Sequence, residues 1–248
     1  MNSLFQYTLR IADSSLILGQ RMSEWCSKGP TLEEDIAMSN IGLDLFGQAN
    51  GFYEYASKLD GSRSADELAF QRNEREFFNH QLTEQENGNF GTTTVRNFLH
   101  DAYNFLFYTQ LSESKDETLA AIAAKSLKEV KYHLRHSSNW LIRLGDGTKE
   151  SNLKAQAALD YLWQYTGELF EMDEIDNEML DQGIGVNNSK LKKAWDEIID
   201  STLKKAKLNR PKDGYMASGS KKGIHTEHLG FLLAEMQFLP RAYPDAKW

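Results

Sequence analysis

The chain has 248 residues, a net charge of -8 at pH 7 and a single cysteine, Cys26. A chain of this length can bury a substantial core, whereas its acidic balance disfavours nucleic acid and anionic lipid as partners. One cysteine forms no intramolecular disulfide, so we expect an inert, partly buried thiol in a helix beside Trp25.

The N-terminal region lacks the apolar segment of a signal peptide, because Asp13, Ser14 and Ser15 interrupt it. No apolar run approaches the roughly 18 residues that a membrane-spanning helix needs. We therefore expect a cytoplasmic protein that does not bind membranes.

The four prolines lie toward the two ends of the chain, and their absence between Pro30 and Pro211 favours long helices. β-Branched residues do not alternate at period two, as they would in strands. The sequence therefore predicts an all-α protein that forms a single domain over residues 1–248. Its helices are expected near residues 3–27, 33–60, 65–83, 92–114, 116–145, 151–170, 188–206 and 223–239.

Helix starts carry suitable residues, since Thr31 and Ser64 each precede acidic residues in the following turn. Residues 171–187 and 207–222 are expected to be irregular, and the second range reads as a polar connector rich in Lys and Gly.

Two of the long helices carry an interior stripe whose spacing alternates between three and four. The first stripe comprises Met38, Ile41, Leu45, Gln48, Phe52, Tyr55 and Leu59. The second comprises Leu119, Ile122, Ser126, Val130, His133, Ser137, Trp140 and Leu144. Gln48 and His133 are the large polar residues near the middle of each stripe. If these helices pack together, the two side chains would face one another inside the bundle.

The stripes resemble those of a di-iron bundle from which the ligands are missing. Such a bundle uses one Glu from each of two helices and a Glu-x-x-His pair from each of two others. Here the corresponding pairs read Leu45 with Gln48 and Val130 with His133. None of the six histidines follows a glutamate by three positions, and leucine and valine cannot bind iron. The sequence therefore predicts a metal-enzyme fold without the metal.

Two acids lie one turn before the polar stripe residues: Asp44 before Gln48, and Glu129 before His133. These four side chains would suit a mononuclear metal site. They would equally suit a buried cluster of hydrogen bonds and ion pairs, because a buried histidine usually has a carboxylate partner. We favour the buried cluster.

Two His-x-x-His pairs remain, His133 with His136 and His225 with His228. His136 is expected to lean away from the stripe. A zinc site at the second pair, which encloses Glu227, would need a further ligand that the sequence does not supply. We favour a helix N-terminal region that is docked by hydrogen bonds. The adjacent Lys221 and Lys222 lie in a flexible segment that either contacts a phosphate or, more commonly, is solvated.

Residues 98–111 are apolar on nearly every helical face, which predicts burial on all sides. Either a partner surface covers this helix or the other segments of the chain surround it. The sequence favours neither interpretation.

Five segments together resemble the C subunits of the bacterial ring-1,2-phenylacetyl-CoA epoxidases. The segments are residues 40–49 (NIGLDLFGQA), 84–90 (EQENGNF), 128–145, 173–176 and 221–230 (KKGIHTEHLG), and the similarity spans essentially the whole chain.

This resemblance implies a ferritin-like long-helix bundle with additional C-terminal helices. It also implies a structural role beside a catalytic A subunit that carries the di-iron centre. On that subunit's pattern the two Glu-x-x-His pairs fall on Leu45 and Gln48 and on Val130 and His133, so no catalytic residue transfers. We expect no metal or cofactor in this chain. The segment with Lys221, Lys222, His225, Glu227 and His228 is a family signature of unknown role.

The implied complex epoxidises the aromatic ring of phenylacetyl-CoA with O2. Its electrons come from NADPH through a reductase that contains flavin and an iron–sulfur cluster. Two alternatives stay open: an oxygenase in its own right that uses a degenerate metal site, and a stand-alone homo-oligomeric ferritin-like protein.

Overall fold

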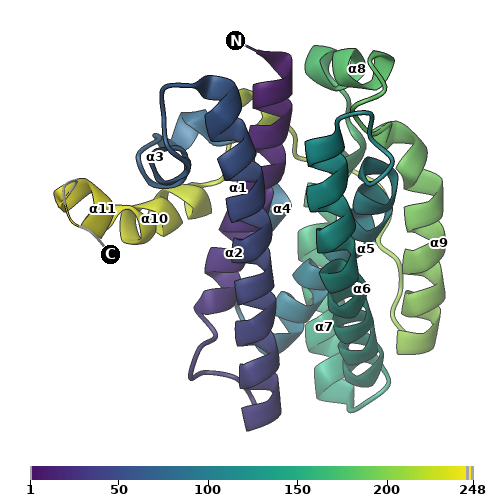
Figure 1. Cartoon of the computed structure of the whole chain (residues 1–248). Coiled ribbons are helices and arrows are strands. Elements are labelled where there is room, and N and C mark those ends of the chain that lie inside the picture. The colour runs from purple at the N-terminus through teal and green to yellow at the C-terminus, as the bar shows by residue number, and fades with distance from the viewer. Residues whose placement is uncertain (1, 244–245, 247–248) are drawn as a thin grey trace. The chain divides into compact units, whose positions relative to one another are not determined.

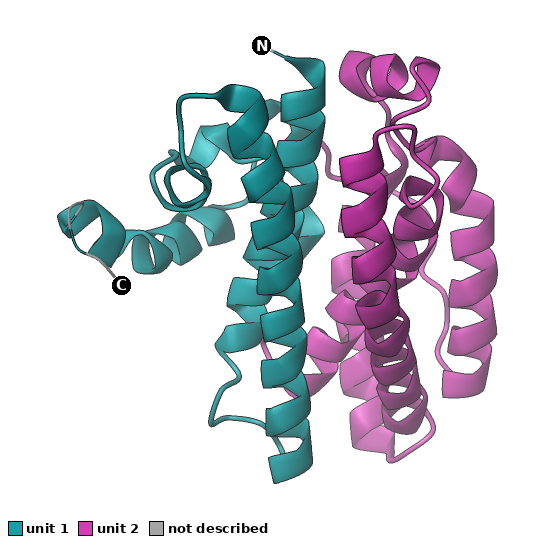
Figure 2. Ribbon diagram, viewed as in Figure 1, with its two compact units in different colours: residues 1–85, 219–248 teal, residues 86–218 magenta. Residues whose placement is uncertain are grey.

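The computed structural model describes residues 2–243 and 246, and within them the chain is helical and contains no strand. The all-α, ferritin-like class with additional C-terminal helices is confirmed. The chain divides into two compact units, Met1–Gln85 with Gly219–Trp248, and Glu86–Ser218 (Figure 2). The single domain stays a prediction. No helix among the described residues is long and apolar enough to cross a bilayer.

The first unit is built on two long helices that pack along one another, α1 (Ser3–Ser23) and α2 (Leu32–Asp60) (Figure 1). The Thr31 hydroxyl caps the start of α2 by accepting from the Glu34 N–H. The helix ends at Gly61, whose φ of 72° is a left-handed conformation that favours glycine.

Shorter elements complete this unit: α3 (Ala65–Phe70), η1 (Glu74–Glu76) and α4 (Gln81–Glu84), followed, after the whole second unit, by η4 (Ser220–Lys222), α10 (Glu227–Met236) and α11 (Phe238–Ala242). The C-terminal helix α10 packs against α4 and η1. Ser64 and Glu67 form a capping box at the start of α3, with bonds of 2.7 and 3.1 Å.

The predicted continuous helix over 65–83 is wrong, because the chain leaves the helical path after Phe70. The guanidinium of Arg72 bonds to the buried Asp13 carboxylate, and the Phe78 N–H donates to the same carboxylate at 2.8 Å. These long-range bonds replace the local bonds that a helix would make at this point, and sequence spacing does not reveal them.

The second unit contains α5 (Phe90–Leu111), α6 (Glu117–Gly145), α7 (Lys149–Leu162), η2 (Trp163–Tyr165), η3 (Gly167–Phe170), α8 (Glu174–Asp181) and α9 (Asn188–Ala206). Helix α5 packs against α6, α7 and α9. The buried Trp195 indole N–H on α9 donates to the Leu99 carbonyl on α5 at 3.0 Å.

The predicted burial of the helix over 98–111 is confirmed only in part. Every residue from Thr93 to Asn104 is buried within the single chain, whereas Phe105 and Leu106 are half-buried and Thr109 and Gln110 are exposed. This burial by the chain itself favours the central-helix interpretation. The helix is less apolar than its sequence suggests, because His100, Asp101 and Asn104 are among its buried residues.

Two further boundary predictions are corrected. The helix expected over 151–170 ends at Leu162 and continues as two 3₁₀ turns. Residues 171–187, expected to be irregular, contain α8. The Asp173 carboxylate caps α8 by accepting from the N–H groups of Ile175 and Asp176, and an Asp-x-x-Asp pattern was the available signal.

Predictions at the two ends of the chain are also corrected. Helix α1 stops at Ser23 rather than at residue 27, so Cys26 lies in an exposed turn instead of a partly buried helix. The helix expected over 223–239 consists of α10 and α11, which meet at Gln237.

Candidate functional site

Leu45 and Val130, the two residues expected at the glutamate positions of a di-iron bundle, are both buried. Leu45 on α2 is 0% exposed and Val130 on α6 is 1% exposed. Gln48 and His133 are likewise buried, whereas Asp44 and Glu129 are half-buried. Asp44 and Gln48 belong to the first unit, and Glu129 and His133 belong to the second.

The two interior stripes are largely confirmed. Their buried members are Met38, Ile41, Leu45, Gln48, Phe52, Leu119, Ser126, Val130, His133 and Ser137, and the half-buried members are Tyr55, Leu59, Ile122, Trp140 and Leu144.

Next to His133, a buried polar contact joins α5 to α6. The Ser137 hydroxyl oxygen lies 2.8 Å from Asp101 Oδ2 and 3.0 Å from the His133 carbonyl oxygen. Burial raises the pKa of Asp101 to about 6, an effect that the nearby His133 and the Ser137 hydroxyl oppose. The sequence pattern does not reveal Asp101 as a candidate, because the surrounding segment reads as apolar.

His136 does not lie in the buried stripe. It is half-buried, and its ring centroid is 6.1 Å from that of Tyr132. On α5, burial lowers the pKa of His100 to about 3, with Arg96 adding to the effect. A neutral His100 can therefore accept a hydrogen bond from the Asn104 amide, which lies 3.2 Å away.

In the first unit, the signature segment meets a buried glutamate. Glu84 on α4 and His225 form an ion pair whose side chains are both 0% exposed, with Nδ1 of His225 2.8 Å from Oε2 of Glu84. The other oxygen of Glu84 accepts from the Thr226 N–H at 2.6 Å and from its hydroxyl at 2.8 Å. The Asn79 amide donates to Oε2 at 2.9 Å.

His225 sits between two acceptors, because its Nε2 lies 2.8 Å from the Phe77 carbonyl oxygen. With Glu84 ionised, both ring nitrogens of His225 donate in this geometry, and the imidazole then carries a positive charge. Burial lowers the pKa of His225, but the hydrogen bond and the charge of Glu84 outweigh it, and the pKa is raised above its ordinary value.

Further bonds hold residues 224–228 against α1 and α4. The Gln81 amide donates to the Ile224 carbonyl at 3.0 Å, and Arg21 donates to the carbonyls of Glu84 and His228. The segment is therefore docked by hydrogen bonds. The other signature residues are less enclosed: Lys221 and His228 are half-buried, and Lys222 and Glu227 are exposed.

A second buried cluster in this unit joins Asp13, Tyr53 and Arg72. The Tyr53 hydroxyl donates to Asp13 at 2.6 Å, and the Arg72 guanidinium lies 4.1 Å from the centroid of the Phe77 ring. Burial and the Asp13 charge raise the pKa of Tyr53 well above its ordinary value. All three ionisable groups serve to join α1, α2 and the segment after α3. The sequence pattern gives no sign of this cluster.

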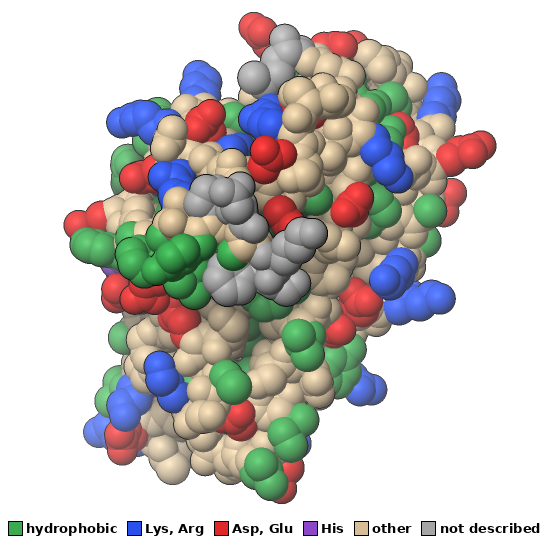
Figure 3. Space-filling view, turned by 60° about the vertical axis from the view of Figure 1, so that its left-hand side comes forward, with side chains coloured by type: hydrophobic (Ala, Val, Ile, Leu, Met, Phe, Trp, Pro, Cys, Tyr) green, Lys and Arg blue, Asp and Glu red, His purple; other side chains and the backbone are tan. Residues whose placement is uncertain are grey.

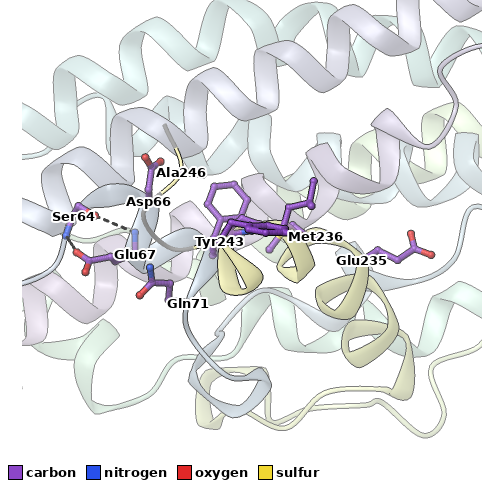
Figure 4. A pocket seen from close by; sticks show the side chains of 11 residues that line it. Ser64, Asp66, Glu67, Gln71, Glu235, Met236, Tyr243 and Ala246 are labelled. Atoms are coloured by element: carbon purple, nitrogen blue, oxygen red, sulfur yellow. Dashed lines mark hydrogen bonds between the residues drawn. The ribbon is translucent and has the colours of Figure 1, made fainter. Parts of the chain in front are cut away.

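A cavity of about 650 Å³ opens between α3 and the C-terminal helices (Figure 4). Its polar lining includes Ser64 and Glu67, whose side chains are engaged in the capping box, and its apolar lining includes Met236 and Tyr243. Among the described residues, no group of three or more His, Cys, Asp or Glu side chains is placed to hold a metal ion.

Comparison with known proteins gives the chain its family. The family of phenylacetic acid catabolic proteins matches residues 1–248. Over 248 residues and the full length of both proteins, the chain is 49% identical to the C subunit of the 1,2-phenylacetyl-CoA epoxidase of Escherichia coli (strain K12). The resemblance that the sequence segments indicated is thereby confirmed, and the chain belongs to the phenylacetic acid catabolic protein family.

Proposed function

We propose that this chain is a non-catalytic structural subunit of a 1,2-phenylacetyl-CoA epoxidase, and that it pairs with a di-iron catalytic A subunit. One observation carries the proposal: Leu45 and Val130, which we assign to the positions of the iron-binding glutamates, are buried aliphatic side chains. Aliphatic side chains supply no ligand and no charge to balance iron, so the oxygen chemistry belongs to the partner.

In this assignment the cofactors reside in other components of a cytoplasmic complex. The catalytic subunit holds the di-iron centre, and a reductase with flavin and an iron–sulfur cluster delivers electrons from NADPH. The name of the Escherichia coli relative, a subunit of an epoxidase, supports membership of a multi-subunit enzyme.

Exposed apolar side chains support an extensive interface. On α2, Leu32, Ile36 and Leu43 are 73%, 53% and 66% exposed, and their spacing places them on one helix face. Hydrophobic side chains also gather on the face that carries the C-terminal helices (Figure 3), where Phe231 and Phe238 are 68% and 67% exposed. We expect an obligate interface on the order of 2,000 Å² or more.

The test combines metal content with assembly. Elemental mass spectrometry of the untagged chain should find iron and zinc near zero while the chain remains folded. Mixed with the catalytic subunit, the chain should elute as a hetero-complex. The variant with Ile36→Asp and Leu43→Asp should lose this co-elution, because charge on the apolar face disfavours burial. Leu153→Asp, at an exposed leucine of α7, is the matched control and should retain it.

Two results would contradict the proposal. A chain that elutes alone in the mixture would have no such partner. One or two metal ions per chain, together with oxygenase turnover that His133→Ala abolishes, would favour the degenerate site as an active site.

A further inference from the structure

The outer face of α6 carries a row of cations, Lys125, Lys128, Lys131, Arg135 and Arg143, hereafter the α6 basic stripe. All five side chains are exposed. At 3.6 residues per turn they fall within about one third of the helix circumference, and at 1.5 Å per residue they extend over about 27 Å.

Among the residues that the structure describes, the cations of the α6 basic stripe lack anionic partners. Within the part of the chain that the structure describes, none of the five makes an ion pair with a carboxylate. Arg135 and Arg143 instead lie over the rings of Tyr132 and Trp140, with 5.5 and 5.2 Å to the centroids. Other exposed cations of the same unit do have partners, as Lys154 has in Glu150, 2.6 Å away.

The positive charge of the α6 basic stripe does not reflect the composition of the whole chain, because the protein has 36 acidic and 28 basic residues. Helix α6 reverses that balance: its acids are Glu117, at its N-terminus, and the half-buried Glu129. Cations that follow one another at i,i+3 and i,i+4, such as Lys128, Lys131 and Arg135, repel each other on a helix. An anionic surface opposite the stripe would relieve this repulsion.

We propose that the α6 basic stripe docks a carboxylate-rich face of another protein component of the epoxidase complex. This inference rests on the proposed function in taking the chain to be a subunit of that enzyme. A length of about 27 Å exceeds the reach of a single phosphate or carboxylate group, whereas a protein surface can present several carboxylates along it. The acidic remainder of the molecule repels nucleic acid and anionic lipid.

The chemistry of the stripe distinguishes this contact from the apolar interface on α2. Among the described residues of α6, Tyr132 is the one large hydrophobic side chain that is exposed, at 40%. Exposed ion pairs are individually weak and are screened by salt, so they suit a component that binds reversibly and is steered by charge.

Lysine acetylation of this chain, alone and after addition of each purified protein component of the complex, tests the docking directly. In about 0.1 M salt, Lys125, Lys128 and Lys131 should be protected from an amine-acetylating reagent when a protein component is added. In about 1 M salt, where the screening length falls to roughly 3 Å, the protection should disappear. Lys190, Lys193 and Lys204, exposed on α9 of the same unit, are the matched controls and should stay reactive. Carbodiimide coupling should join the protected lysines to Asp or Glu of the added protein.

Charge reversal gives the second readout. The variant with Lys128→Glu, Lys131→Glu and Arg135→Glu should have an affinity for that component that is lower by up to roughly tenfold at low salt. The variant with Lys190→Glu, Lys193→Glu and Lys204→Glu carries the same charge change on α9 and should bind as the unaltered chain does. Because all six residues are exposed, we expect both variants to fold as the unaltered chain does, so a difference in binding reports on the stripe.

The outcomes separate this inference from the proposed function. Co-elution with the catalytic subunit in about 1 M salt depends on apolar contacts and reports only on the proposed function. The inference is overturned if no protein component protects the stripe. It is equally overturned if coenzyme A alone, duplex DNA or this chain at high concentration protects it as well as a component does.

Discussion

At the scale of single residues, hydrogen-bond donors surround the buried carboxylate of Glu84. Glu84 receives hydrogen bonds from Thr226 and Asn79 in addition to His225. An unpaired charge in such a place would be costly, whereas this one is fully satisfied. The signature histidine therefore has a structural task, which is to hold the returning C-terminal segment to α4.

This pairing predicts a pH-dependent stability. The pKa of folded His225 is raised above its unfolded value near 6.5, so its contribution is fully present below that pH and is lost as the pH rises through the folded pKa. His225→Gln leaves Glu84 without its cation and should destabilise the chain at pH 6 by about 3–5 kcal/mol. Urea unfolding at a series of pH values measures both effects.

His80→Gln is the control for this series, since His80 is also a histidine of the first unit. It should retain the loss of stability at high pH, whereas His225→Gln should abolish it. Identical pH profiles for His225→Gln and the unaltered chain would refute the imidazolium assignment.

At the scale of elements, two glycines in long helices have opposite surroundings. A Cβ at Gly145, the last residue of α6, would lie 2.1 Å from the Ala206 carbonyl oxygen at the end of α9. A Cβ at Gly47, in the middle of α2, would meet nothing within 4 Å. The first glycine permits a close approach of two helices, and the second occupies an exposed helix position.

Substitution to alanine should therefore act in opposite directions at these positions. Gly145→Ala should destabilise the chain by about 3 kcal/mol, because a backbone carbonyl cannot move away as a side chain can. Gly47→Ala should stabilise it by roughly 0.5–1 kcal/mol through helix propensity. Thermal unfolding of the isolated chain measures both, and equal effects at the two positions would contradict the packing of α6 on α9.

At the scale of the whole molecule, the first unit is discontinuous in sequence. Its C-terminal part, from Gly219, is made only after the complete second unit, and it carries His225. We expect one cooperative unfolding transition, because neither end of the first unit is complete without the other and the chain passes twice between the units. Near- and far-ultraviolet circular dichroism should give coincident curves. Two separate transitions would show that the units unfold independently and that the single-domain prediction is wrong.

The sequence by itself determined the helical class and the long helices, and it supports the expectation that iron ligands are missing. These follow from local spacing: the absence of proline favours long helices, and residues three apart share a helix face. The helix over Asn188–Ala206 was predicted with its observed bounds, and the interior stripe of α2 was confirmed from Met38 to Phe52.

Only the tertiary structure decided the break after Phe70, the buried pairs and the place of Asp101. Each depends on groups far apart in the chain, such as Arg72 with Asp13 and His225 with Glu84, and local periodicity carries no information about such pairs. The physical reason is that a buried charge is costly unless it is paired, so the buried carboxylates of Asp13 and Glu84 require partners that distant segments supply. After Phe70 the chain accordingly leaves the helical path, and Arg72 and Phe78 bond to Asp13.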